Sequence, residues 1–595
     1  MPTESCKLYL MEFGQSHNQI VFTNRARCRD CYRCLRVCPV EAIGIRDGQA
    51  FVDERRCVSC GTCIRECPQK AKCYRKDLAA AMELVQNGRA AVSLAPSFAC
   101  LFEDWEVRRI PSALRKLGFT YVAETASGAE WVAAQTAEYV RSHAGQLCIA
   151  TACPAVVHYV QRYRPELSDK LVPVISPMAA HGRAIKARLW SDVKVVFIGP
   201  CVAKKSELQT GAADSVDAAL TFEEMFVWFE LANIKLSDFE ESSFDESPAR
   251  TARLFPLEGG CLKTASLPVD YCDTRNVSVS GFESICDALD GLSASSDGCL
   301  LEPLFCSQGC INGPVMGCHK PLLDRKQSIL RYMNHSSPGA ASVSPVELVH
   351  TFQTGGISDE AVTEEQIRRV LEKTGKQNPD DQLNCGACGY QTCRQQAIAV
   401  LRQMAEPEMC ISWMRRLAER RTDRIIETSP NGIVTLDAHL TILHVNSSFK
   451  RLFMCTDAVC GKPVSYLMDP APFQKVASGQ QELFESAVHH EKYNLYCHEI
   501  IYALQPEGQL VGIFVNLTRA VTSKRQYDQL QAQTLEQARN LLRHQVDMAG
   551  KIAEYLGQST AAGEKLLVSL MQIAQNPPAQ DKGSGGWLNG IYTSK

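Results

Sequence analysis

The stretch CRDCYRCLRVCP, residues 28–39, has a close copy in CVSCGTCIRECP, residues 57–68. Each copy sets four cysteines at gaps of two, two and three residues and ends in Cys-Pro. Gaps of two residues let one loop curl around a compact group and present three thiols, while the fourth thiol comes from further along the chain. Eight thiols in a duplicated run are typical of metal ligands rather than of disulfides.

This spacing is that of bacterial two-cluster ferredoxins, in which the fourth cysteine of each run binds the cluster of the other run. We therefore expect a ferredoxin domain with two 4Fe-4S clusters over residues 20–78. One cluster is expected on Cys28, Cys31, Cys34 and Cys67, and the other on Cys57, Cys60, Cys63 and Cys38. Zinc also binds Cys-x2-Cys pairs, but the duplicated run ending in Cys-Pro disfavours zinc.

A third cysteine group lies in NCGACGYQTCRQQAIAVLRQMAEPEMC, residues 384–410. Glycines beside the first two cysteines let the backbone wrap closely, and residues 394–405 are predicted to be helical and to return the last cysteine to the others. The group resembles the small 4Fe-4S domain of several anaerobic redox proteins, which implies a domain over residues 375–415, and structural zinc is the alternative. The expected ligands are Cys385, Cys388, Cys393 and Cys410.

The composition is that of an ordinary globular protein. The 595 residues suggest about four domains, and 45% are hydrophobic and 22% charged. A net charge of -3 gives no electrostatic case for binding nucleic acid or an acidic membrane. The N-terminus shows no secretory signal and no apolar run is long enough for a membrane span. We expect a cytoplasmic, anaerobic protein, because 28 cysteines in a reducing compartment fit metal binding better than disulfides.

Residues 80–350 alternate strand-like apolar runs with helical stretches, which predicts an α/β domain. An acidic stretch, DFEESSFDESP at 238–248, is expected to be a solvated loop, and the stretch from His335 reads as a linker. Three segments in this domain place cysteines at strand ends: IATACPAVV at 149–157, PCVAKKSE at 200–207 and LEPLFCSQGC at 301–310. Each cysteine alone reads as a buried thiol. Cys306 and Cys310 are one helical turn apart and can face one site, and Lys204 and Glu207 follow Cys201 at steps of three.

Together these segments resemble the three signature stretches of FeFe-hydrogenases, T-S-C-C-P, P-C-x2-K-x2-E and C-x3-C. The resemblance extends over ISPMAAHGRAIK, residues 175–186, and the ferredoxin run. It implies an H-cluster, in which a 4Fe-4S cubane is bridged to a two-iron subcluster with CO, cyanide and azadithiolate ligands. Cys153, Cys201, Cys306 and Cys310 would bind the cubane, and Cys310 would bridge to the two irons. Lys204 would hydrogen-bond a cyanide, and Glu207 would support Lys204 or the proton path.

The sequence departs from the family pattern at three places. The first cysteine of T-S-C-C-P, which carries protons in the family, is Ala152; the methionine before Pro200 is Gly199; and the stretch after Cys310 reads INGPVMG. Without the thiol at position 152, the proton path is broken or rerouted. Because general acid-base transfer contributes ~10²–10⁴-fold to the rate, we expect slow turnover. The same alanine occurs in the sensory group of the family, which implies an oxidoreductase acting on hydrogen that reports hydrogen or redox state. The alternatives are an iron-sulfur assembly or electron-transfer protein without the two irons, and a catalytic ferredoxin hydrogenase with another proton path.

Residues 423–520, opening on IIETSPNGIVTLDAHLTILHVNSSFKRLF from Ile425, resemble a PAS domain. Residues 523–575 show apolar residues at alternating steps of three and four, as in a coiled coil, or in an amphipathic helix folded back on its own domain. The whole chain is thus expected to have a multidomain α/β and α+β architecture: ferredoxin, H-cluster, small 4Fe-4S and PAS domains and a C-terminal helix. The implied partners are H2 and protons, ferredoxin or another redox protein, H-cluster maturation proteins, an unknown downstream signalling protein and, in a homodimer, a second copy.

Overall fold

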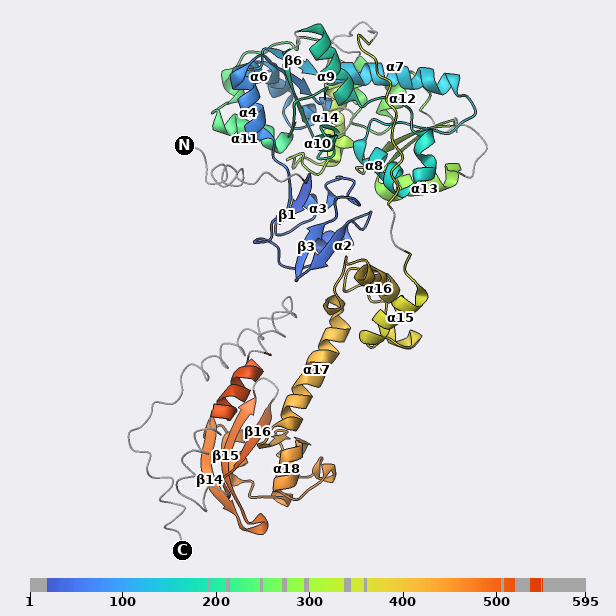
Figure 1. Cartoon of the computed structure of the whole chain (residues 1–595). Coiled ribbons are helices and arrows are strands. Elements are labelled where there is room, and N and C mark those ends of the chain that lie inside the picture. Colours follow the sequence, from blue (N-terminus) through green and yellow to red (C-terminus); the bar gives the residue numbers. More distant parts are fainter. Residues whose placement is uncertain are drawn as a thin grey trace. The chain divides into compact units, whose positions relative to one another are not determined.

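A computed structural model describes the chain except for residues 1–18, 190–191, 210–213, 247–249, 270–274, 294–298, 336–343, 358–360, 505–507, 519–535, 547 and 549–595 (Figure 1). The chain divides into two compact units, and the boundary falls between Met409 and Cys410. Within the described ranges, none of the helices is both long and apolar enough to cross a membrane.

The first cysteine-rich region forms two small antiparallel ribbons and two single-turn helices. Strand β1 (Val21–Thr23) pairs with β4 (Lys72–Tyr74), and β2 (Ile43–Arg46) pairs with β3 (Gln49–Val52). Helices α2 (Arg33–Arg36) and α3 (Thr62–Arg65) occupy equivalent places in the two cysteine runs. The backbone repeats as well, because the residues two and four positions after the first cysteine of each run have positive φ: Asp30 and Tyr32, and Ser59 and Gly61.

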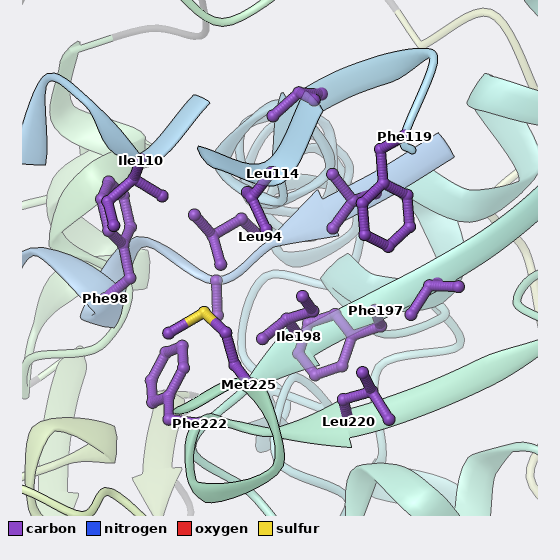
Figure 2. Close-up of a cluster of buried hydrophobic side chains, with 14 of the residues drawn as sticks. Leu94, Phe98, Ile110, Leu114, Phe119, Phe197, Ile198, Leu220, Phe222 and Met225 are labelled. Carbon is purple, nitrogen blue, oxygen red and sulfur yellow. The ribbon is translucent and has the colours of Figure 1, made fainter. Parts of the chain in front are cut away.

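The next region is built on a four-stranded parallel sheet in the order β6-β5-β8-β9. Its strands are β5 (Ala90–Leu94), β6 (Tyr121–Glu124), β8 (Lys194–Gly199) and β9 (Ala218–Thr221). The helices around it include α4 (Leu78–Asn87), α6 (Ile110–Lys116), α7 (Ala126–Ser142), α9 (Pro177–Arg188) and α11 (Phe222–Leu231). Figure 2 shows part of its core, where Leu94, Ile198 and Leu220 from three strands meet side chains from helices. Strands buried on both faces are typical of parallel sheets covered by helices.

A second parallel sheet has the order β10-β11-β7. Its strands are β7 (Cys148–Ile149), β10 (Asn276–Ser280) and β11 (Leu300–Leu304), and its neighbouring helices are α8 (Pro154–Tyr163) and α13 (Phe282–Ser293). Further short helices are α5 (Asp104–Val107), α10 (Lys204–Glu207) and α12 (Gly260–Thr264), and α14 (Leu322–His335) precedes the linker. The α/β prediction for this region is confirmed.

Most of the described part of the acidic stretch at 238–248 is solvated, as predicted: Asp238, Glu240, Glu241 and Asp245 are exposed. Its end is held more closely than the prediction implies. The Arg115 guanidinium donates to Asp245 at 2.9 Å, and the Val122 amide donates to the same carboxylate at 2.7 Å. Glu246 lies further in, with 8% of its side chain exposed, and contacts His181. Asp245 and Glu246 therefore bind residues of the edge strand β6 and a buried histidine, while the earlier acidic residues of the stretch project into water.

The third cysteine group packs on the ferredoxin-like region. Helix α15 (Glu364–Lys373) lies against α16 (Cys393–Leu401), which ends four residues earlier than the sequence predicts. After α16 the Met404 carbonyl accepts from the Ile45 amide at 2.9 Å, and Glu406 accepts from Asp47 and Gly48 at the tip of the β2-β3 hairpin.

The second unit begins with α17 (Ile411–Thr428) and contains a five-stranded antiparallel sheet in the order β13-β12-β16-β15-β14. The strands are β12 (Gly432–Leu436), β13 (Ile442–Val445), β14 (Leu483–His490), β15 (Leu495–Leu504) and β16 (Gln509–Asn516), with helices α18 (Ser447–Leu452) and α19 (Ala471–Ala477). Asn446 links these elements, because its side chain accepts from the amides of Ile433 and Phe449, both at 2.8 Å.

Most of the predicted helical segment 523–575 lies outside the described residues. Residues 536–546 are helical, and Leu541 packs against apolar side chains of the antiparallel sheet, among them Ile513. This contact agrees with a helix folded back on its own domain over the described stretch, and the coiled coil stays a prediction.

Candidate metal centres and their cavity

The eight ferredoxin-type cysteines gather into two groups in the pattern expected from the sequence. Burial raises the pKa of Cys34, and repulsion from Cys28, Cys67 and Cys31 adds to it. Burial and then repulsion from Cys60 and Cys57 raise the pKa of Cys38 to about 12. Each group therefore combines three thiols of one run with the last thiol of the other.

In both runs the sulfur of the last cysteine accepts a hydrogen bond from a backbone amide. The Ala42 amide donates to Cys38 Sγ, and the Ala71 amide donates to Cys67 Sγ, both at 3.2 Å. Hydrogen bonds to sulfur are one of the means by which proteins set the potential of an iron-sulfur cluster. Both sulfurs are thus prepared to carry negative charge.

The four cysteines of the α/β domain come together from three strand ends. Cys153 follows β7 and caps α8, Cys201 follows β8, and Cys306 and Cys310 follow β11. Burial raises the pKa of Cys201 to about 12 with a contribution from Cys153. Burial also raises the pKa of Cys306, and repulsion from Cys310, Cys201 and Cys153 adds to it. Burial raises the pKa of Cys310 as well, with repulsion from Cys153 and Cys201. Carboxyl ends of parallel strands are where open α/β sheets place their ligands.

The segment between Cys306 and Cys310 differs from the expected helical turn. Gln308 and Gly309 have φ of 65° and 84°, so the backbone turns back on itself before a short 3-10 helix at Cys310–Asn312. A Cβ on Gly309 would lie 2.3 Å from the Pro256 oxygen. The two thiols still face one site, but a tight turn that needs glycine brings them there.

A cavity of about 100 Å³ lies beside these cysteines. Its walls are mostly apolar and include Ala152, Cys153, Cys201 and Cys310. Lys204 also lines it, and its Nζ donates to the backbone oxygen of Ala152 at 3.3 Å and to Glu207 Oε2 at 3.1 Å. The cavity thus combines thiols, a cation and apolar walls.

Glu207 accepts hydrogen bonds from Lys204 and from the N-cap residue of helix α9. Its Oε2 accepts from Ser176 Oγ at 2.9 Å, and Ser176 is the N-cap of α9. The carboxylate is therefore held by two donors, and it fixes the direction of the ammonium. Glu207 lies outside the residues that line the cavity, so the structure favours the supporting role over direct contact with a bound group.

Two further residues shape the cavity. A Cβ on Gly199 would lie 2.5 Å from the Phe197 ring, so that ring, which lines the cavity, fills the space of a side chain at 199. Glu302 in β11 also lines the cavity and accepts from the amides of Cys261 and Leu262 at 2.9 and 3.2 Å. Burial raises the pKa of Glu302 to about 7. The sequence analysis missed Glu302, whose signal was a carboxylate inside an apolar strand.

The third cysteine group is described only in part. Cys385, Cys388 and Cys393 follow one another around Gly386 and Gly389, both with positive φ, and the Asn384 side chain accepts from the Cys393 amide at 2.8 Å. Cys410 is buried but is the first residue of the second unit. Its place with the other three stays a prediction.

The thiol groups fit cubanes better than single ions. Zinc needs four ligands about 2.0–2.3 Å from one centre, and among the described residues no three His, Cys, Asp or Glu converge on one ion. A cubane binds each thiolate at a separate iron, so the four sulfurs need not converge on one point. The cavity beside Cys310 leaves space for further atoms on one side of such a cubane.

The groups follow one another through the first unit. Burial raises the pKa of Cys60, and repulsion from Cys153 adds to it, so the group of Cys38, Cys57, Cys60 and Cys63 lies next to the cavity. Cys388 of the third group packs in the same apolar cluster as Cys28 and Cys34. Fold and thiols together define an iron-sulfur protein. Its α/β domain brings four cysteines and the ammonium of Lys204 together beside one cavity.

Family models identify the domains. Residues 89–314 match the iron only hydrogenase large subunit, C-terminal domain; residues 10–72 match a 4Fe-4S dicluster domain; and residues 381–412, which include all four cysteines of the third group, match an Fe-S cluster family. Residues 89–314 are therefore identified as an iron only hydrogenase C-terminal domain, with iron-sulfur domains before and after it.

Solved structures resemble parts of the chain. A HydA(ΔEFG) structure on stepwise H-cluster assembly is 13% identical with a TM-score of 0.40, and a HydA1 variant from Chlamydomonas reinhardtii is 14% identical with a TM-score of 0.39. Each alignment covers 48% of this chain and 100% of that chain. The PAS domain of an HTR-like protein from Haloarcula marismortui is 24% identical with a TM-score of 0.15, over 17% of this chain and 96% of that one.

Proposed function

We propose that the chain is a sensory FeFe-hydrogenase that oxidises hydrogen and reduces protons slowly and reversibly. The observation that carries the proposal is the position of Lys204, whose ammonium lines the cavity left beside Cys153, Cys201 and Cys310. Glu207 already supplies the negative charge that a buried ammonium needs, through their contact at 3.1 Å. The ammonium nevertheless lines the cavity, where a cyanide ligand of a two-iron centre would accept a hydrogen bond from it and a plain cubane would offer no such acceptor.

In this proposal Cys153, Cys201, Cys306 and Cys310 would hold the H-cluster cubane, and Cys310 would also hold the two-iron subcluster with its CO, cyanide and azadithiolate. When bound, this group supplies the site at which H2 is split. Lys204 orients it by donating a hydrogen bond, and Glu207 holds Lys204 through their 3.1 Å contact. The apolar walls keep water away from the reacting site.

The cluster order gives an electron route. Electrons pass from the H-cluster to the group with Cys60, then to the group with Cys34, and then to the third cluster on Cys385, Cys388, Cys393 and Cys410. The contact of Cys388 with the cluster of apolar side chains around Cys34 supports the last step. A ferredoxin or another redox protein exchanges electrons at the outer clusters.

The sensory role rests on Ala152 and on the second unit. Ala152 puts a methyl group at the cavity wall where the family pattern has a thiol, so protons must take another route, which favours slow turnover. The strand order of the second unit, with Asn446 joining β12 to α18, supports the proposal that this unit is a PAS domain. We propose that this domain reports the redox state to a downstream signalling protein, in a cytoplasmic and anaerobic setting, after maturation proteins have installed the two irons.

Hydrogen-dependent reduction of a viologen dye tests the activity. Protein produced with maturation proteins should reduce the dye under H2, and protein produced without them should contain the 4Fe-4S clusters and reduce none. Equal iron content in the two preparations, with no reduction in either, would contradict the proposal and would support an assembly or electron-transfer protein.

A further inference from the structure

A line of hydrogen-bonded side chains begins at the wall of the cavity beside Ala152. Thr125 lines the cavity, and its Oγ1 is 2.7 Å from Ser93 Oγ. Ser93 Oγ is 2.7 Å from Nδ1 of His181, and Nε2 of His181 is 3.1 Å from Oε2 of Glu246. Three consecutive contacts therefore join four polar groups.

These groups are buried in an otherwise apolar part of the domain. Ser93 and His181 are fully buried, and Thr125 is 5% exposed. Buried hydroxyls and imidazoles cost free energy unless they are hydrogen-bonded, and here they meet that need by bonding to one another. Hydroxyls can donate or accept, and imidazole can do both at its two nitrogens, so the line can pass a proton in either direction.

The other end of the line reaches a second cavity. Glu246 lines a space of about 330 Å³ together with Asp104, Arg108 and Glu241. Its Oε1 accepts from the Tyr121 hydroxyl at 2.8 Å and from Arg188 at 3.4 Å, and the Arg188 side chain is 60% exposed. Protons at Glu246 are thus within reach of solvent.

We propose that Thr125, Ser93, His181 and Glu246 form the proton path between the reacting site and solvent, in place of the route that Ala152 lacks. The inference rests on the proposed hydrogenase function. Splitting H2 yields two protons and two electrons; the electrons leave through the clusters, and the protons need a separate way through the apolar wall.

Each outward transfer moves one proton. Thr125 Oγ1 takes a proton in the cavity and gives its own to Ser93 Oγ, which gives its own to Nδ1 of His181. The imidazolium then loses its Nε2 proton to the Glu246 carboxylate, and water in the second cavity takes it from there. The hydroxyls and the imidazole then return to their first orientation and tautomer, and proton reduction uses the same steps reversed.

Glu302 is a weaker candidate for this task. It also lines the first cavity, but the hydrogen bonds described for its carboxylate come from the backbone amides of Cys261 and Leu262. Backbone amides donate without passing a proton onward, so Glu302 has no described route to solvent.

Turnover of matured variants tests the path. Thr125→Val keeps the shape of the side chain and removes the hydroxyl, and Glu246→Gln removes the outer acceptor. Each should lower the rate of hydrogen oxidation at least about 10²-fold, the lower end of the range for proton-transfer groups. Thr125→Ser keeps the hydroxyl and should stay within about threefold of the unchanged chain. Ser142→Ala is the matched control, because it breaks a Ser-His contact of 2.9 Å at the exposed end of α7 and should leave the rate unchanged.

A second readout needs no two-iron centre. Hydrogen-deuterium exchange at the imidazole C2 carbon, followed by mass spectrometry on protein that carries only its 4Fe-4S clusters, reports the surroundings of His181. Because Glu246 contacts Nε2 of His181 at 3.1 Å, Glu246→Gln should change the exchange rate of His181, and Ser142→Ala should leave it unchanged. Tyr121, Arg188 and Asp245 also face this end of the path and stay the same in all variants.

The outcomes separate the two claims. Full rates in both Thr125→Val and Glu246→Gln, in a matured protein that oxidises hydrogen, would overturn the path and leave the hydrogenase proposal standing. An unchanged exchange rate at His181 in Glu246→Gln would also overturn the path. Matured unchanged protein without any hydrogen oxidation would overturn both, because the path then has no reaction to serve.

Discussion

The ammonium of Lys204 lies 3.3 Å from the backbone oxygen of Ala152, the residue that replaces the proton-carrying cysteine of the family pattern. The cation and the lost thiol therefore belong to one wall of the same cavity. The chain keeps the group expected to orient the diatomic ligands and lacks the group expected to move protons.

We expect Lys204→Met to lower hydrogen oxidation about 10- to 100-fold, because a hydrogen bond from a charged donor contributes roughly 1.5–3 kcal/mol. The measurement is the rate of viologen reduction under H2, with iron content as a check on assembly. Lys194→Met is the control, since that ammonium is 47% exposed and pairs with Asp217 at the far end of β8. A Lys204→Met protein with full iron and full activity would contradict the assigned role.

We expect Ala152→Cys to change the rate less than tenfold, against the ~10²–10⁴ of a working acid-base group. The reason is that, in the proposed path, protons leave through Thr125. A thiol at position 152 would add a proton-carrying group outside that path. Rates of matured Ala152→Cys and unchanged protein, measured side by side, check this. A hundredfold increase would show that proton transfer at 152 limits turnover.

We expect Glu246 to make stability depend on pH in acid. Burial alone would raise the pKa of Glu246, but hydrogen bonds from His181, Ser127 and Tyr121 outweigh it and hold the pKa at about 2, below the ordinary 4.5. A lowered carboxyl pKa stabilises the fold above pH 4.5 and loses that effect as the pH falls toward 2. The melting temperature of Glu246→Gln should therefore lie below that of the unchanged chain by a constant amount from pH 8 to pH 5. Below pH 4.5 this difference in melting temperature should become smaller. A difference that grows in acid would contradict the lowered pKa of Glu246.

We expect Arg253→Met to destabilise the first unit by about 3–5 kcal/mol, because it leaves the Glu124 carboxylate buried without its cation. Arg253 and Glu124 form a bidentate pair with 7% and 0% of their side chains exposed. Asp290→Asn, which breaks an exposed pair with Arg164 at 2.6 Å, should cost at most about 1 kcal/mol. Denaturant unfolding of the full chain, followed by fluorescence, measures the free energy of unfolding of both variants. An equal loss of free energy in the two would contradict the larger contribution expected of the buried pair.

The local patterns of the sequence predict more than its long-range contacts. The spacing of the cysteine runs predicts two thiol groups, because a loop of fixed length limits where three thiols can lie. The convergence of Cys153, Cys201 and Cys306 needs the parallel sheets, and it was predicted only through the family resemblance. The turn at Gly309 was missed because four-residue spacing suits a helix as well as a tight turn.

The proposed proton path lies beyond what composition or spacing can predict. Its contacts join residues 32, 88 and 65 positions apart in the sequence. The acidic stretch that supplies Glu246 looked like a solvated loop by charge alone. Only the packing of that stretch along β6 brings one of its carboxylates to a buried histidine.

The infrared spectrum of the matured chain, recorded with and without hydrogen, tests the central claim most directly. The account predicts absorption bands of CO and cyanide that shift when hydrogen is added. A matured protein with intact 4Fe-4S clusters and no such bands would contradict the claim that the cavity beside Lys204 holds a two-iron centre.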